Sequence, residues 1–177
     1  MNTANKLTFL RIILIPIYLV LFLADFPAHF YYAVIVYMIA CITDFIDGKL
    51  ARSRDQVTSF GKFADPLADK ILVTASLLCL MQAGRIGMIP ILIVLIREFA
   101  VTGLRAAIAI EGTVFAAGRS GKLKTLLQMV CIIYLHFEIA AGNVTLLGDI
   151  LVWGMVAITV ISGVIYFYAN RKSISFK

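Results

Sequence analysis

Four aspartates in the first half of the chain have the spacing expected of a metal site. Asp44 and Asp47 are three residues apart, and Asp65 and Asp69 are four residues apart. On helices, either spacing places both carboxylates of a pair on one face. A short turn over residues 51–62 would bring the two pairs together. Four converging carboxylates repel one another unless cations neutralise them, so the pattern predicts bound metal ions.

The ligand chemistry of this segment favours Mg²⁺ or Mn²⁺ over zinc. Residues 44–69 contain no His and no Cys, so only oxygen ligands are available. Such ions commonly bridge carboxylates to substrate phosphates, which predicts a diphosphate substrate. Gly48 and Gly61 lie close to the aspartates and would allow a ligand to approach the backbone. Close packing of helices is an equally good reason for either glycine alone.

The elements that must carry these residues are membrane helices. The chain is 62% hydrophobic and 15% charged, with a mean hydropathy of +0.97, which excludes an ordinary soluble domain. A spanning helix needs about 20 apolar residues, so the chain has room for about six spans and no soluble domain. We therefore expect an all-α fold, a single membrane domain over residues 1–177, with six transmembrane helices at residues 7–24, 30–50, 63–81, 88–110, 123–140 and 146–170.

The basic residues indicate how these helices are oriented. If the six spans alternate, one side of the membrane receives only Arg85, and the other receives Lys6, Arg52, Arg54, Lys62, Arg119, Lys122, Lys124, Arg171, Lys172 and Lys177. The positive-inside rule makes the second side cytoplasmic. We therefore expect a multi-pass protein of the cell's inner (cytoplasmic) membrane, with both termini and the aspartates at the cytoplasmic side. The net charge of +6 is dispersed between spans, so nucleic acid is not an expected partner.

The aspartate segment resembles the signature of the CDP-alcohol phosphatidyltransferase family at all of its fixed positions. It is written Asp44-Phe-Ile-Asp47-Gly48-Lys-Leu-Ala51-Arg52, then residues 53–60, then Gly61-Lys-Phe-Ala-Asp65-Pro-Leu-Ala-Asp69. Outside the signature, other motifs resemble the bacterial members that use glycerol 3-phosphate: Asn5-x-x-Thr8-x-x-Arg11, Gly61-Lys62-Phe63, Asp65-Pro66-Leu67-Ala68-Asp69-Lys70, Arg97-Glu98 with Arg105, and Gly121-Lys122-x-Lys124-Thr125.

This resemblance implies a six-helix membrane enzyme, usually a homodimer, with a polar cavity open to the cytoplasm. It implies transfer of a phosphatidyl group from CDP-diacylglycerol to glycerol 3-phosphate, with Asp69 as general base. It implies two Mg²⁺ or Mn²⁺ ions held by Asp44, Asp47, Asp65 and Asp69. It also implies a CDP-diacylglycerol site formed by Asn5, Thr8, Gly48, Arg52, Thr58 and Gly61.

Basic residues inside the predicted fourth span and at the start of the fifth favour an anionic acceptor. Arg97 lies near the middle of its span, and Arg105 lies a further ~12 Å along the helix. Lys122 opens the next span, where unpaired backbone N–H groups attract anions. Our hypothesis is that Arg97, Arg105 and Lys122 bind the acceptor's phosphate, with Lys62 nearby.

Structural roles for the same charged residues remain open. Glu98 and Arg105 are seven residues apart on one helical face, so they could form an internal ion pair. Lys124 and Arg119 are interpreted as ordinary cytoplasmic anchors. Roughly the last fifty residues are expected to contribute only apolar helix.

Other functions also fit parts of the pattern. The same chemistry could use inositol phosphate, serine or phosphatidylglycerol as acceptor. Membrane prenyltransferases also bind diphosphates through aspartates and magnesium, but they have more spans than this length permits. A transporter would explain charges within spans but not the paired aspartates with their fixed glycines.

Overall fold

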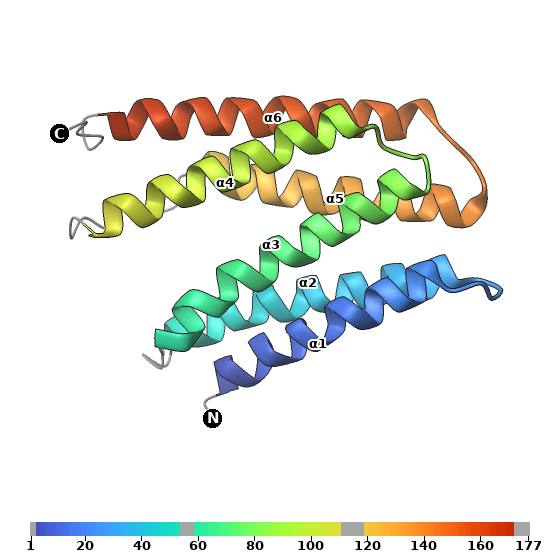
Figure 1. The fold of residues 1–177 in the computed structure, drawn as a ribbon, viewed down its shortest axis with the longest axis horizontal. Coiled ribbons are helices and arrows are strands. Elements are labelled where there is room, and N and C mark those ends of the chain that lie inside the picture. The colour runs from blue at the N-terminus through green and yellow to red at the C-terminus, as the bar shows by residue number, and fades with distance from the viewer. Residues whose placement is uncertain (1–2, 54–58, 111–118, 172–177) are drawn as a thin grey trace. The chain divides into compact units, whose positions relative to one another are not determined.

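The computed structural model describes residues 3–53, 59–110 and 119–171, and the side chains of residues 9–43, 64, 66–108 and 121–171. Throughout this part the chain is all-α, as the sequence predicts (Figure 1). There are six helices: α1 (Thr3–Leu23), α2 (His29–Ser53), α3 (Ser59–Gln82), α4 (Met88–Ile110), α5 (Arg119–Ala141) and α6 (Leu146–Asn170).

The helix boundaries correct the predicted turn at the aspartates. We expected a turn over residues 51–62, but α2 continues to Ser53 and α3 already begins at Ser59. Hydropathy marks only the apolar part of a helix, whereas residues such as Ala51 and Arg52 continue a helix because of their backbone propensity. All four predicted aspartates therefore lie within helices.

The helices form two compact units, which are described separately. The first unit comprises Met1–Arg85 and Ile132–Val144, and the second comprises Ile86–Cys131 and Thr145–Lys177. The first unit thus contains α1, α2, α3 and the second half of α5. The second unit contains α4, the first half of α5, and α6.

The core of the first unit is built on α1, which packs against both α2 and α3. Its buried side chains follow helical spacing and include Arg11, Ile15, Tyr18 and Phe22. Every fourth residue of α3 is buried in the same way: Ala64, Ala68, Leu72, Ser76 and Leu80. His136 of α5, for which the sequence indicated no partner, lies 2.7 Å from the Tyr18 hydroxyl and is fully buried.

An ion pair joins the ends of α3 and α5. Both helices end in a glycine at positive φ, Gly84 at 72° and Gly142 at 66°, followed by the paired hydrogen bonds of a Schellman motif. Arg85 follows Gly84, and its guanidinium is bonded to Glu138 of α5. Arg85, the one basic residue that the sequence placed on its side of the membrane, is buried in this pair.

Two of the described helices are long and apolar enough to cross a membrane. They are Gly121–Ala141 of α5 and α6, Leu146–Asn170. Large apolar side chains are also exposed on other helices, including Val20 of α1 and Ile96 of α4. Such surfaces are typical of contact with lipid, so these features are those of a membrane protein.

Candidate functional site

The four predicted metal ligands lie on two helices of the first unit. Asp44 and Asp47 belong to α2, and Asp65 and Asp69 belong to α3. Residues 54–58 join these helices and can span at most about 20 Å, so the end of α2 stays near the start of α3. The side chain of Asp69 is described and is half-buried, whereas those of the other three aspartates lie outside the described side chains.

All six predicted donor-site residues also lie outside the described side chains, namely Asn5, Thr8, Gly48, Arg52, Thr58 and Gly61, and so does the neighbouring Lys62. Except for Thr58, which lies outside the described residues, they belong to α1, α2 and α3, and α1 contacts both other helices. Among the described residues, no group of three or more His, Cys, Asp or Glu could hold a metal ion. The aspartate site therefore stays a prediction.

Asp69 lies next to two buried alanines of α3. Ala68, beside it in the chain, is 1% exposed, and Ala64 one turn earlier is also buried. Alanines at this spacing let two helices approach closely. Since consecutive residues of a helix point in different directions, Asp69 is placed at the edge of this contact, where its carboxylate is partly accessible.

Three charged side chains meet in the second unit. The Arg97 guanidinium donates to a Glu98 carboxylate oxygen over 2.9 Å through one nitrogen, and to the Ser162 hydroxyl over 3.0 Å through another. The Lys124 ammonium is paired with the same Glu98 oxygen. The cluster therefore joins α4, α5 and α6, and two cations share one carboxylate.

This cluster corrects two interpretations of the sequence. The possible ion pair between Glu98 and Arg105 is wrong, because Glu98 is paired with Arg97 and Lys124. Lys124 is also not a solvated cytoplasmic anchor, since it is only 4% exposed. Burial of a lysine in this setting requires its carboxylate partner.

Arg105 and Lys122 differ from Arg97 because their positive charge is not paired with a described carboxylate. Both are exposed, and within the described part of the chain neither forms an ion pair with a carboxylate. The Arg105 guanidinium lies 5.2 Å from the centre of the Tyr166 ring, a cation–π contact that leaves its charge uncancelled. Of the described residues predicted for the acceptor phosphate, these two are the most available to an anion.

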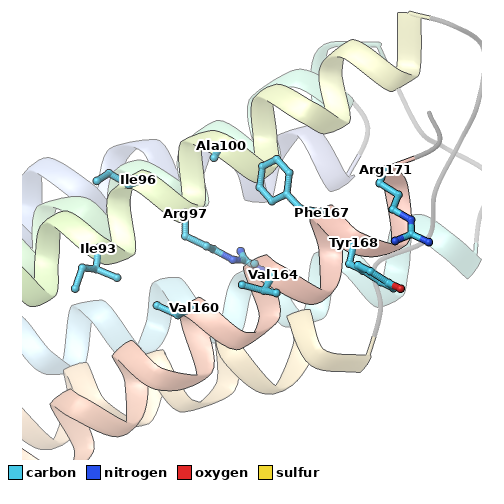
Figure 2. Close-up of a pocket in the computed structure, with 10 residues that line it drawn as sticks. Ile93, Ile96, Arg97, Ala100, Val160, Val164, Phe167, Tyr168 and Arg171 are labelled. Carbon is cyan, nitrogen blue, oxygen red and sulfur yellow. The ribbon is translucent and has the colours of Figure 1, made fainter. Parts of the chain in front are cut away.

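Arg97 passes from α4 to α6 at the one point where α6 carries no side chain in its way. Figure 2 shows Arg97 extending toward α6 beside Val164. A Cβ added to Gly163 would lie 3.0 Å from Cγ of Arg97 and 3.9 Å from its Nε. The absence of a side chain at Gly163 therefore leaves room for Arg97 to reach Ser162 on α6.

We expect Gly163→Ala to destabilise the protein by about 1–3 kcal/mol, because the added methyl overpacks the Arg97 side chain. Thermal unfolding in detergent measures this change. Gly154→Ala is the matched control in the same helix, since its Cβ would meet nothing closer than Cδ2 of Leu127 at 4.0 Å. Equal melting temperatures for the two variants would contradict the role of Gly163.

The sequence interpretation missed the polar face of α6. Thr159, Ser162 and Gly163 are all buried, and the Ser162 hydroxyl donates to the Thr159 carbonyl oxygen over 3.0 Å. The expectation that this region contributes only apolar helix is therefore wrong. Small polar residues at helical spacing inside an apolar run were the available signal.

Comparison with known proteins gives a match over most of the chain. The family model described as CDP-alcohol phosphatidyltransferase matches residues 1–161. A Bacillus subtilis (strain 168) protein named CDP-diacylglycerol–glycerol-3-phosphate 3-phosphatidyltransferase is 39% identical over 190 residues, covering 98% of this chain and 97% of that protein. A Rickettsia bellii (strain RML369-C) protein of the same name is 37% identical over 174 residues, covering 97% of this chain and 96% of its own length.

Proposed function

Because the chain belongs to the CDP-alcohol phosphatidyltransferase family, we propose that it transfers the phosphatidyl group of CDP-diacylglycerol to glycerol 3-phosphate. The products are phosphatidylglycerophosphate and CMP. The observation that carries this proposal is the similarity to relatives of that name over 97–98% of the chain. Family membership also confirms the resemblance noted in the aspartate signature and the assignment of the chain as a transferase.

The four aspartates are the proposed metal site. Enzymes of this family generally depend on divalent metal ions, and an all-carboxylate ligand set suits two Mg²⁺ or Mn²⁺ ions. Asp44 and Asp47 lie on α2, three residues apart, and Asp65 and Asp69 lie on α3, four residues apart. When bound, the ions would stabilise negative charge on the diphosphate of the donor.

The residues of this chain then have distinct proposed roles in the reaction. Asp69 accepts the proton of the acceptor hydroxyl, whose oxygen attacks the lipid-side phosphorus while the bond to CMP breaks. The partial exposure of Asp69 supports a carboxylate that can reach a substrate. The donor is bound by the residues that resemble the family motifs, Asn5, Thr8, Gly48, Arg52, Thr58 and Gly61.

The acceptor phosphate is bound by basic residues, of which Arg105 and Lys122 are the main ones. Both are exposed, and neither is paired with a described carboxylate. Arg97 contributes through its cluster, because two cations and one carboxylate leave one net positive charge there. Lys62 is the fourth proposed member. The described members Arg97, Arg105 and Lys122 together carry more positive charge than the Glu98 carboxylate cancels. This excess supports a phosphorylated acceptor over neutral serine.

The proposed setting is a single domain, residues 1–177, with six spans in the cell's inner membrane. All six helices are at least 21 residues long, and a spanning helix needs about 20 residues. The distribution of basic residues supports cytoplasmic termini and a cytoplasmic active site. The family resemblance supports a homodimer, with bilayer lipids around it.

The proposed function is tested by an acceptor panel. Purified full-length protein is given CDP-diacylglycerol with Mg²⁺ or Mn²⁺, and CMP release is measured with glycerol 3-phosphate, inositol phosphate, serine or phosphatidylglycerol. We expect metal-dependent release with glycerol 3-phosphate alone. Release with another acceptor would mean that the proposed acceptor is wrong and that the other compound is the substrate. No release with any acceptor would refute the enzyme assignment.

In the same assay, we expect Arg105→Glu to raise the KM for glycerol 3-phosphate at least about tenfold, because one charge-assisted contact is replaced by repulsion. The KM for CDP-diacylglycerol should change little. Asp25→Lys, at an exposed position in the turn after α1, is a control for altered charge. An unchanged acceptor KM in Arg105→Glu would remove Arg105 from the acceptor site.

A further inference from the structure

A groove of about 700 Å³ runs between α4 and α6 of the second unit. Figure 2 shows its lining, with Ile93 toward one end and Arg171 toward the other. The described lining includes no Asp or Glu. Most of it is apolar and consists of Ile93, Ile96, Ala100, Val160, Val164 and Phe167. Several of these side chains are largely exposed, including Val164 at 63% and Ile96 at 59%.

The polar groups of the groove are concentrated at the end of α6. Arg171 follows the last residue of this helix, and its guanidinium lies 4.2 Å from the centre of the Tyr168 ring. Within the described part of the chain, no carboxylate is paired with Arg171. The other lining arginine, Arg97, already donates to Glu98. Among the lining residues, Arg171 is therefore the cation that no described carboxylate pairs with, and it lies at one end of the groove.

The length of the groove matches one leaflet of a bilayer. From Val160 to Arg171 the helix rises ~16 Å. The hydrocarbon core of a bilayer is about 30 Å thick, so one leaflet accounts for roughly 15 Å. A cation and a tyrosine at one end, followed by one leaflet's depth of apolar lining, complement an amphiphile with an anionic head and an acyl chain.

We propose that this groove binds one anionic glycerophospholipid of the bilayer. Its phosphate lies at Arg171, and one acyl chain lies along Phe167, Val164 and Val160. A basic residue at a membrane surface favours an anionic over a zwitterionic headgroup by about fivefold. The lipid is a resident of the groove and is distinct from the donor, whose proposed site is on α1, α2 and α3.

Native mass spectrometry of the full-length protein tests this proposal. The protein is mixed with equal amounts of dioleoyl phosphatidylglycerol and dioleoyl phosphatidylcholine, and the lipid retained is counted. We expect about fivefold preference for phosphatidylglycerol. Arg171→Gln should abolish the preference, Arg171→Lys should keep it, and Val164→Trp should remove the bound lipid by filling the groove.

Two controls show whether a loss of bound lipid is specific to the groove or follows from a general effect of the substitution. Ile165→Trp introduces the same side chain at the next position of α6, which is exposed but does not line the groove, and should retain the lipid. Thermal unfolding shows whether each variant is folded. Equal retention of both lipids, or unchanged retention in Val164→Trp, would overturn the proposal.

The same samples show whether the groove is instead occupied by the donor lipid or by a second copy of the chain. If CDP-diacylglycerol displaces the retained lipid, the groove is the donor's own acyl site and the proposal is wrong. It is equally wrong if Val164→Trp converts a dimer to a monomer without loss of lipid, because a second copy of the chain then covers the groove.

Discussion

Replacement of Asp69 by Asn should lower the rate of CMP release by about 10²–10⁴, the usual contribution of a general base. Asparagine has nearly the same size but cannot accept the proton of the acceptor hydroxyl. It also removes a negative charge from the proposed metal site. The measurement is kcat with saturating CDP-diacylglycerol and glycerol 3-phosphate, and the KM values should change much less.

A metal titration separates the two proposed roles of Asp69. If the residue acts only as a metal ligand, excess Mg²⁺ should restore the rate of Asp69→Asn. If it acts as the base, the rate stays low at every metal concentration. Asp25→Asn is the matched control, since that side chain is exposed in a turn and should leave the rate unchanged. Full activity of Asp69→Asn without added metal would exclude both roles.

The second large effect is expected from Glu98→Ala, which should destabilise the protein by about 3–5 kcal/mol. The substitution leaves the side chains of Arg97 and Lys124, which are 13% and 5% exposed, without their shared carboxylate. Uncompensated charges in such a setting are more costly than the ion pair is favourable. The measurement is the thermal unfolding midpoint of the purified protein.

A second substitution tests this explanation. Adding Lys124→Met to Glu98→Ala removes one of the two uncompensated charges and should recover part of the lost stability. Asp25→Ala also removes one negative charge, but from an exposed position, and should change stability by less than about 0.5 kcal/mol. If the double variant is no more stable than Glu98→Ala, the charge cluster does not account for the loss.

The order and position of the helices could be predicted from hydropathy alone. Long apolar runs leave few alternatives to helix, and the six helices of the described residues begin and end within a few residues of the expected ranges. Helix ends that lie in charged stretches were harder to predict. The apolar part of the second helix stops at Leu50, whereas the helix continues to Ser53. Backbone propensity, which sustains such a stretch, leaves no mark in a hydropathy profile.

The candidate site was predicted in part. The four aspartates lie on α2 and α3, the two helices on which the sequence placed them, and their role as metal ligands stays a prediction. The partners of Glu98 could not be predicted from spacing, because neighbouring residues of a helix do not normally face each other. Here the long Arg97 side chain turns toward Ser162, and Lys124 approaches from another helix. Such contacts depend on packing between helices distant in sequence.

The first unit is assembled from parts of the chain that are made at different times. Tyr18 and His136 are 118 residues apart, and Arg85 and Glu138 are 53 apart. At about 5–20 residues per second, a ribosome makes His136 some 6–24 s after Tyr18. For that interval α1, α2 and α3 lack the helix that completes their core. The N-terminal half of the protein is therefore expected to finish folding only after most of the second unit has been synthesised.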